Sequence, residues 1–335
     1  MKIMLINHYA GSDTYGMEFR PYYMAREWVK LGHEVVIVAA DYSHLRKINP
    51  VIKKNFTQEI IDGIKYVWIK TPTYHGNGVK RAINMAAFFF KVKCGLGRLA
   101  REYAPEAVIA SSTYPFDFYL ARRLAKRTGG RCYFELHDLW PLTQIELYGM
   151  SNKNPYVRLL QKAEDTAYRY AEKIISVLPD AYKHMEERGF NADKFVYIPN
   201  GINLYPQQGP PEQTAQVKLI AERRAQGKFI VMYLGGFSLA NALEELIGAS
   251  KFIDDDVLIV LVGSGVKKQE LIELDRKTAS GKVLFLDAVP KDEVQDVLSA
   301  ADCLYIGAKR CTLYRYRAGM NKLYDYMLAA KPVIC

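Results

Sequence analysis

The sequence predicts an α/β protein with two doubly wound domains, each a parallel sheet with helices on both faces. Short β-branched segments alternate with segments long enough for helices along almost the whole chain. This alternation occurs twice, on either side of a proline- and glycine-rich stretch at residues 204–211. The 335 residues, half of them hydrophobic, suffice for two cores of ordinary size.

The elements follow one another in the order that a parallel sheet requires. The first domain, predicted over residues 1–204, has strands at 2–7, 34–40, 64–70, 106–111, 131–136 and 173–178, and helices that include 17–31 and 155–171. The second domain, predicted over residues 205–335, has strands at 229–235, 257–263, 282–287, 303–307 and 331–335. Helices of this length between strands are typical of crossover connections.

Composition and charge limit the class of protein. The five cysteines show no C-x-x-C spacing, which argues against a disulfide framework or zinc site and for reducing cytosol: Cys94, Cys132, Cys303, Cys311 and Cys335. No apolar run approaches the roughly 20 residues of a membrane-spanning helix, and the opening residues resemble a strand more than a signal peptide. The net charge of +10 predicts an anionic partner. Nucleic acid is disfavoured because the chain lacks an aromatic stacking platform or reading motif.

Ligands of such sheets bind beyond the carboxyl ends of the strands, so the loops there supply the candidates. After the first strand, Gly11 and Gly16 precede a helix, and they form either a phosphate or sugar loop or a plain turn, without a G-x-G-x-x-G fingerprint. After the strand at 131–136, His137 either contacts substrate or is a structural histidine, and Asp138 is a candidate to orient its ring.

The second domain presents two glycine turns and a cation. Gly235 and Gly236 would let backbone amides approach a diphosphate, with a helix expected to begin near residue 240, and Gly263 belongs to the matching turn of the next strand. Near the end, Lys322 and Asp325 are three apart and share one face of a predicted helix. One side chain could therefore meet phosphate while the other meets ribose.

These motifs resemble glycosyltransferase family 4. The resemblance rests on residues 16–40, "ELHDLWP" at 135–141, "YIPNGI" at 197–202, "YLGGFSLANALEELI" at 233–247, "LVGSGVKKQEL" at 261–271 and "GMNKLYDYMLAAKPVI" at 319–334. Within the family, the sequence most resembles the bacterial polysaccharide-assembly branch that includes L-N-acetylfucosamine transferases. The resemblance implies the GT-B fold of two Rossmann-like domains facing a cleft, and retaining transfer of a hexosyl or N-acetylhexosaminyl group from a UDP-sugar.

The resemblance also implies roles for individual residues. Lys322 would neutralise the diphosphate, Asp325 would bind ribose, and His137 would contact the donor sugar. The other donor-binding positions that it implies are Gly235, Gly236, Asn241, Gly263 and Val289, and the acceptor-side positions are Gly11, Gly16 and Arg20. No metal or other cofactor is expected, because protein cations would stabilise the leaving diphosphate and no D-x-D motif stands in a matching loop.

The sequence departs from the family pattern in three places. It lacks the arginine and lysine that many relatives have after the first glycine turn, so Arg310, Arg315 or Arg317 would assist Lys322 unless these arginines are solvated surface charges. Arg317 stands where relatives have a carboxylate. The chain ends before the closing elements of relatives, so the C-terminal domain is expected to be incomplete.

The helix expected within residues 76–103 bears on the acceptor. It combines apolar residues with six cations and almost no acids, a pattern typical of either a helix lying on an anionic membrane or a buried crossover helix: Lys80, Arg81, Lys91, Lys93, Arg98 and Arg101. The membrane alternative predicts a polyprenyl-diphosphate-linked glycan acceptor and a cytoplasmic protein held peripherally at the inner membrane face. Two other functions remain open: a sugar-nucleotide epimerase of the same fold and a non-catalytic nucleotide-sugar-binding protein.

Overall fold

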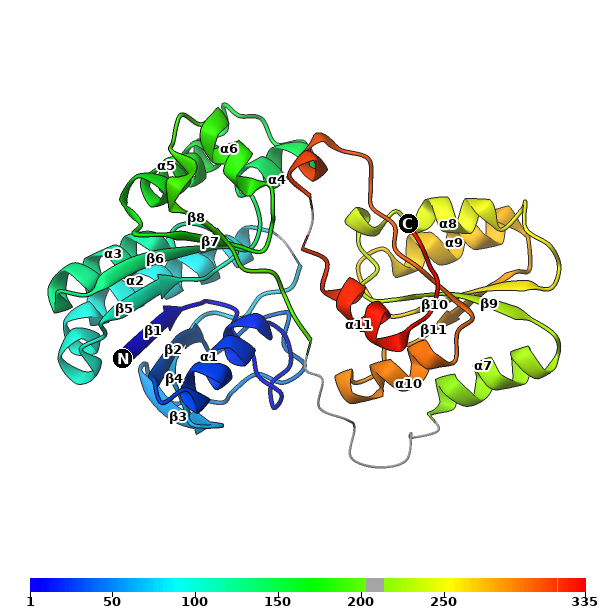
Figure 1. Cartoon of the computed structure of the whole chain (residues 1–335), viewed down its shortest axis with the longest axis horizontal. Helices are drawn as coiled ribbons and strands as arrows, with labels where there is room; N and C mark the ends of the chain where they lie inside the picture. The colour runs from blue at the N-terminus through cyan, green and yellow to red at the C-terminus, as the bar shows by residue number, and fades with distance from the viewer. Residues whose placement is uncertain (77, 203–213, 318) are drawn as a thin grey trace. The chain divides into compact units, whose positions relative to one another are not determined.

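The computed structural model describes residues 1–76, 78–202, 214–317 and 319–335, and it divides into two compact units (Figure 1). Unit 1 comprises Met1–Pro199 and Thr312–Gly319, and unit 2 comprises Asn200–Cys311 and Met320–Cys335. The predicted linker and domain boundary, at residues 204–211, lie outside the described residues. The chain's return to unit 1 at Thr312 was not expected from the sequence.

Unit 1 contains a sheet of eight strands within the described residues, in the order β3-β4-β2-β1-β5-β6-β7-β8. The strands are β1 (Lys2–Ile6), β2 (Glu34–Ala40), β3 (Thr57–Ile61), β4 (Ile64–Ile69), β5 (Ala107–Ala110), β6 (Arg131–Leu136), β7 (Ile174–Ser176) and β8 (Phe195–Tyr197). The helices are α1 (Arg20–Lys30), α2 (Val79–Tyr103), α3 (Asp117–Thr128), α4 (Leu142–Glu146), α5 (Pro155–Tyr170) and α6 (Ala181–Glu187), with 3₁₀ turns η1 (Ala192–Lys194) and η4 (Thr312–Tyr316).

Two strands of this sheet were not predicted, and one of them runs against the others. β3 pairs antiparallel with β4 through a turn in which Asp62 and Gly63 both have positive φ, +49° and +78°. An Asp-Gly pair between β-branched segments is a strong hairpin signal, because both central residues of such a turn need positive φ. β8 has only three residues, too few for a sequence pattern to indicate a strand.

Helices cover both faces of the unit 1 sheet. On one face, Tyr22 and Ala25 of α1 pack with Ile37 and Trp68 of the strands. α1 begins at Arg20, three residues later than predicted, with a proline in its first turn. α2 connects β4 to β5 and buries one face, which includes Phe88. This agrees with a crossover helix and leaves the membrane role of its exposed face a prediction. Among the described residues, none of the helices combines the length and apolar character of a membrane-spanning segment.

Unit 2 contains a parallel sheet of five strands within the described residues, in the order β11-β10-β9-β12-β13. The strands are β9 (Phe229–Leu234), β10 (Val257–Val262), β11 (Val283–Leu286), β12 (Cys303–Tyr305) and β13 (Val333–Ile334). The helices are α7 (Ala215–Ala225), α8 (Leu243–Ala249), α9 (Lys268–Thr278), α10 (Val294–Ser299) and α11 (Asn321–Ala329), with 3₁₀ turns η2 (Leu239–Asn241) and η3 (Lys291–Glu293).

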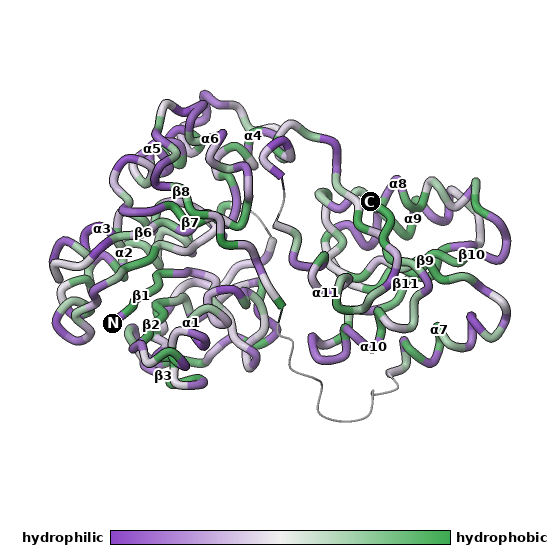
Figure 2. Tube along the Cα trace, viewed as in Figure 1, coloured by the Kyte–Doolittle hydropathy of each residue, from purple (hydrophilic) through white to green (hydrophobic). Residues whose placement is uncertain are grey.

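The two faces of the unit 2 sheet have separate apolar cores. Residues of α7, α10 and α11 pack with one set of strand residues, which includes Met232 and Val260. Residues of α8 and α9 pack with the alternate set, which includes Ile259 and Leu261. Figure 1 shows α8 and α9 on one side of this sheet and α7, α10 and α11 on the other, and Figure 2 shows hydrophobic colour concentrated on the strands of each unit. Burial on both faces explains the nearly continuous apolar strand sequences.

Close backbone contact at the carboxyl ends of β9 and β10 makes glycine necessary there. Gly263 has a φ of +154°, and a Cβ atom built on it would lie 1.9 Å from the carbonyl oxygen of Gly235. Gly265 has the same φ, and its Cβ would lie 2.4 Å from the carbonyl oxygen of Phe237. The two predicted glycine turns therefore lie directly against each other.

We expect Gly263→Ala to lower the free energy of unfolding by roughly 2–4 kcal/mol, because the new methyl group strains the backbone and pushes the two turns apart. Gly227→Ala is the matched control. Its φ is +82° but no heavy atom lies within 4 Å of the added Cβ. It should cost only about 1 kcal/mol, the backbone strain alone. Urea unfolding followed by circular dichroism measures both, and equal losses would contradict the contact argument.

Candidate functional site: a lysine at a glycine turn and a buried histidine cluster

A lysine from α11 lies against the glycine turn that follows β9. The Nζ atom of Lys322 donates to Asn241 Oδ1 at 2.6 Å and to Tyr233 Oη at 2.9 Å. It also lies 4.5 Å from the centroid of the Tyr233 ring, within cation–π distance. The predicted convergence of Lys322, Asn241 and the Gly235–Gly236 turn is therefore observed within unit 2.

The same two side chains fix the carbonyl group of the turn. Tyr233 Oη and Asn241 Nδ2 each donate to the Gly236 carbonyl oxygen at 2.8 Å. Tyr233 and Asn241 thus bind Lys322 with their acceptor atoms and Gly236 with their donor atoms. Gly236 is exposed and its backbone N–H has no acceptor among the described residues. The Gly235 N–H donates to the Val262 carbonyl oxygen at 3.0 Å, so the prediction that both amides of the turn approach an anion holds at most for Gly236.

Lys322 is a partly buried cation without a carboxylate partner among the described residues. Burial lowers the pKa of Lys322 to about 8. The ammonium is therefore mostly charged at neutral pH and loses its charge as the pH rises through 8. A desolvated ammonium that no acid neutralises is suited to binding an anion such as a diphosphate.

The helix expected near residue 240 begins later than predicted. Residues Leu239–Asn241 form a 3₁₀ turn, Ala242 has a φ of +47°, and α8 begins at Leu243 and has seven residues. The helix thus starts three residues after the predicted position. The interruption holds Asn241 outside the helix, where its side chain reaches both Gly236 and Lys322.

Other predicted donor-side residues have contacts within unit 2. Asp325 Oδ1 accepts from Lys291 Nζ at 2.5 Å, so its carboxylate has a cation beside it. Val289 packs against the core that contains α10 and α11. Arg310 is exposed on the loop after β12. The ribose and nucleobase roles of Asp325 and Val289 stay predictions.

In unit 1, His137 belongs to a buried hydrogen-bonded cluster at the carboxyl end of β6. Its Nε2 atom lies 3.2 Å from Glu135 Oε2 and 3.1 Å from Ser111 Oγ. Burial by itself would lower the pKa of His137, but the Glu135 carboxylate outweighs it and raises the pKa above the usual histidine value. Nδ1 has no hydrogen-bond partner among the described residues, so it remains available to a ligand.

Glu135 contacts both His137 and Arg20, and so connects the histidine to an arginine of α1. Its Oε1 atom accepts from Arg20 Nε at 2.9 Å, and both side chains are 6% exposed. Burial would raise the pKa of Glu135, but His137, Arg20 and Ser111 lower it to about 2. The Arg20 guanidinium also donates to the carbonyl oxygens of Ile198 and Pro199, the last residues of unit 1 before the chain enters unit 2. The predicted acceptor role of Arg20 stays a prediction, alongside these structural contacts.

Asp138 does not orient the His137 ring, contrary to the sequence-based expectation. Its carboxylate instead accepts from Leu139 N, Trp140 Nε1 and Thr143 Oγ1, which fixes the turn before α4. Glu135 is the residue that contacts the ring. Glu135 lies two positions before His137, which follows β6 directly, and two-residue spacing in extended backbone places both side chains on the same side. The sequence signal for Glu135 was its charge inside an otherwise largely apolar strand segment.

The predicted first-loop glycines pack closely against backbone. A Cβ on Gly11 would lie 1.8 Å from the Gly16 carbonyl oxygen, and one on Gly16, whose φ is +93°, would lie 2.9 Å from Lys47 N. Behind this loop, the buried guanidinium of Arg46 donates to the carbonyl oxygens of Ala10 and Ala40. These contacts account for both glycines structurally, and their acceptor-side role stays a prediction.

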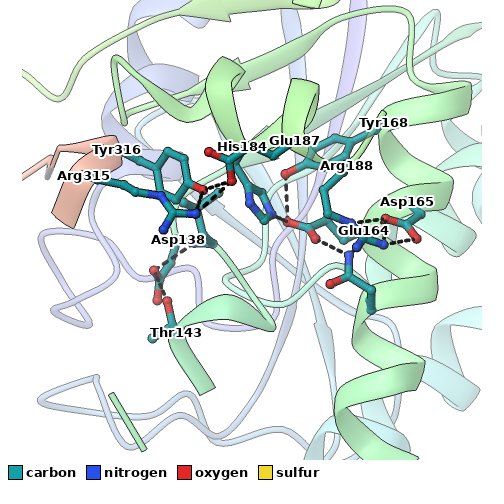
Figure 3. Close-up of polar contacts among 12 residues, drawn as sticks. Asp138, Thr143, Glu164, Asp165, Tyr168, His184, Glu187, Arg188, Arg315 and Tyr316 are labelled. Carbon is teal, nitrogen blue, oxygen red and sulfur yellow. Dashed lines mark hydrogen bonds and ion pairs between the residues drawn. The ribbon is translucent and has the colours of Figure 1, made fainter. Parts of the chain in front are cut away.

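The arginines before α11 pair with carboxylates of unit 1. Arg315 and Tyr316 both bind Glu187, and Arg317 lies 3.2 Å from Asp180. Figure 3 shows Arg315 and Tyr316 reaching Glu187 beside His184, and His184 in turn contacts the buried Glu164. Tyr316 is fully buried. These ion pairs attach residues 312–317 to α6 and to the residue before it. A phosphate role for Arg315 or Arg317 stays a prediction.

Comparisons with known proteins identify the relatives of this chain. WcaI of Escherichia coli K12, assigned as a colanic acid biosynthesis glycosyl transferase, is 21% identical over 297 residues, which are 85% of this chain and 71% of WcaI. The crystal structure of Anabaena HepE in complex with UDP and glucose has a TM-score of 0.65 at 15% identity, covering 99% of this chain and 80% of that one.

A second solved structure is WaaG, a glycosyltransferase involved in lipopolysaccharide biosynthesis. Its TM-score is 0.62 at 14% identity, with 99% of this chain and 80% of that chain covered. These likenesses show the GT-B fold of two parallel-sheet units. The family model of Glycosyltransferase Family 4 matches residues 15–205, more than half of the chain, and the protein therefore belongs to Glycosyltransferase Family 4.

Proposed function

We propose that this glycosyltransferase moves a sugar from a UDP-sugar, with retention of the anomeric configuration, to a glycan acceptor in bacterial polysaccharide or lipopolysaccharide assembly. The observation that carries the proposal is the partly buried ammonium of Lys322 beside the Gly235–Gly236 turn. The HepE structure contains UDP, and the names of WcaI and WaaG indicate polysaccharide and lipopolysaccharide assembly.

The chemistry follows from the charge that develops on the leaving group. As the bond between the anomeric carbon and the UDP oxygen breaks, negative charge accumulates on the diphosphate. Lys322 and the backbone N–H of Gly236 stabilise that charge. The acceptor hydroxyl forms its bond to the anomeric carbon on the face that UDP leaves, and its proton passes to the departing phosphate oxygen. Protein cations and amides supply the stabilisation, and we propose no metal cofactor.

His137 orients the donor sugar in this proposal. Glu135 and Ser111 hold its Nε2 side, which leaves Nδ1 to donate to a sugar hydroxyl or an anionic oxygen. Glu135 raises the pKa of His137 and so favours the cationic ring, in which both ring nitrogens are donors. A fixed donor of this kind favours one sugar orientation over others.

The exposed face of α2 supports a membrane-bound acceptor. Val79, Ile83 and Phe90 are exposed large apolar side chains on this helix, which also carries exposed cations, and Lys93 Nζ lies 5.8 Å from the Phe90 ring centroid. α3 packs beside α2 and adds Arg122, Arg123, Lys126 and Arg127. Apolar residues among cations are typical of helices that lie on anionic membranes. We propose a polyprenyl-diphosphate-linked glycan as acceptor and peripheral attachment to the inner membrane face.

One observation favours a second candidate, a non-catalytic nucleotide-sugar-binding protein. The position where many family members have a carboxylate is Arg317, and its guanidinium is paired with Asp180. Such a protein would bind UDP-sugars without releasing UDP. Incubation with a panel of UDP-sugars and a polyprenyl-lipid extract, followed by mass spectrometry of the lipids, separates the two: a glycosylated lipid supports transfer, and bound but unconsumed donor supports the alternative.

Lys322→Ala should reduce turnover about 10²- to 10³-fold, because the leaving diphosphate loses its nearest cation. The readout is UDP released per enzyme with the donor and lipid extract identified above. Lys251→Ala, an exposed lysine of unit 2 between α8 and β10, is the matched control and should retain wild-type turnover. Unchanged turnover in Lys322→Ala would reject this role for Lys322.

Glu135→Gln should move the pKa of His137 from above 6.5 to below it, because burial then acts without the carboxylate. The stability gained from the His137 cation is fully present below pH 6.5 and is lost as the pH rises through its raised pKa. The Glu135→Gln variant should therefore lack this extra stability at low pH. Histidine NMR titration measures the shift, with His137→Asn to assign the signal and Glu135→Asp to restore the charge. An unmoved pKa in Glu135→Gln would count against the pairing.

Replacing Lys80, Lys93 and Arg101 of α2 with glutamate should reduce binding to vesicles that contain anionic lipid by at least about tenfold. The control replaces Lys218, Lys251 and Lys277 of unit 2, which are also exposed and give the same change in net charge. Co-sedimentation with anionic and neutral vesicles measures both. Equal losses in the two triple variants would indicate a net-charge effect and contradict a specific surface on α2.

A further inference from the structure

Tyr233 is the residue beneath Lys322 that the sequence did not single out. It lies on β9 with no exposed surface, and its hydroxyl is placed between the lysine and the glycine turn. Lys322 donates to Tyr233 Oη at 2.9 Å, and that hydroxyl donates in turn to the Gly236 carbonyl oxygen at 2.8 Å. Asn241 makes the equivalent pair of contacts from the other side.

The four groups therefore form a closed ring of hydrogen bonds. An ammonium group has three N–H donors, of which Tyr233 and Asn241 accept two. Among the described residues, no third acceptor of Lys322 is found. Since Lys322 is only partly buried, its third donor is accessible to a ligand. The ring thus fixes the ammonium beside the turn while one donor stays available.

We propose that Tyr233 is a positioning residue: it holds Lys322 against the Gly235–Gly236 turn so that one N–H is directed at the diphosphate of a nucleoside diphosphate. The inference rests on the proposed function, in which this turn receives UDP. It deepens that function by assigning to Tyr233 the alignment of the lysine with the turn. The ligand class is a nucleoside diphosphate, since a single directed ammonium beside the backbone N–H of Gly236 matches adjacent phosphate oxygens.

The neutrality of the two acceptors is essential to this role. A carboxylate at either position would form an ion pair with Lys322 and compete with the diphosphate for the cation. A phenol and a carboxamide accept hydrogen bonds without neutralising the charge, and the ring face of Tyr233 adds cation–π attraction at 4.5 Å. Lys322 is therefore ordered before the nucleotide binds, which reduces the entropy lost on binding.

The test compares UDP and uridine binding by isothermal titration calorimetry. Tyr233→Phe removes the hydroxyl but keeps the ring, so it should weaken UDP binding roughly tenfold and leave uridine binding unchanged. Tyr305→Phe is the matched control. Tyr305 is a half-buried tyrosine of β12 whose hydroxyl donates to the Ala242 carbonyl oxygen at 3.2 Å. The control variant should bind UDP as the wild type does. Equal UDP affinity in Tyr233→Phe and wild type would overturn the proposal.

A double-mutant cycle separates positioning of the lysine from shaping of the turn. If Tyr233 acts through Lys322, Tyr233→Phe should change UDP affinity less than about twofold in the Lys322→Ala background. If it acts only through the Gly236 carbonyl group, the full tenfold loss should persist in that background. Persistence of the loss would overturn the inference.

A readout without nucleotide distinguishes failure of this inference from failure of the proposed function. Wild-type protein that does not bind UDP would reject the proposed function. The contact of Tyr233 with Lys322 is then judged by acetylation of Lys322 with acetic anhydride, quantified by peptide mass spectrometry at pH 8. Loss of an acceptor disfavours the charged ammonium, so Lys322 should react several-fold faster in Tyr233→Phe than in wild type and Tyr305→Phe. Equal rates in all three would overturn the positioning role.

Discussion

The candidate site of unit 2 is organised around the partly buried ammonium group of Lys322, which has no carboxylate partner among the described residues. Removing a cation from water is costly, and here the cost is offset by a phenol, a carboxamide and an aromatic face rather than by an ion pair. The arrangement also requires the two glycine turns to touch, since any side chain at Gly263 would collide with the Gly235 carbonyl oxygen. An incoming anion is the partner that would complete this site.

Unit 1 uses its buried cations differently. Arg20 and Arg46 each bind backbone carbonyl groups with their guanidinium groups, and Arg20 adds the Glu135 carboxylate. They hold loops at the carboxyl edge of the sheet. In the Glu135 cluster, His137 Nδ1 has no protein partner among the described residues. The chemistry proposed for this unit therefore rests on a histidine whose charge and orientation depend on its neighbours.

The segment that precedes α11, residues 312–319, belongs to unit 1, whereas α11 belongs to unit 2. Residues 312–317 are attached to unit 1 by Tyr316, which is fully buried, and by the ion pairs of Arg315 and Arg317. Gly319 lies close to Val177, where a Cβ would be 2.9 Å from the carbonyl oxygen. Lys322 follows three residues later. The cation of unit 2 is thus covalently close to an element that is fixed on unit 1.

The sequence by itself determined the alternation of strands and helices, the parallel sheets, the two glycine turns and the prominence of His137 and Lys322, because these follow from local periodicity and from residue types at strand ends. The sequence also contains the Asp-Gly signal of the β3–β4 hairpin at residues 62 and 63. The tertiary structure alone decided that Glu135 rather than Asp138 holds His137, that Arg315 and Arg317 bind carboxylates, and that Tyr233 supports Lys322. The physical reason is distance along the chain: Tyr233 and Lys322 are 89 positions apart, and Arg315 and Glu187 are 128 apart. Such pairs meet only when strand order and register are set, and no local pattern encodes them.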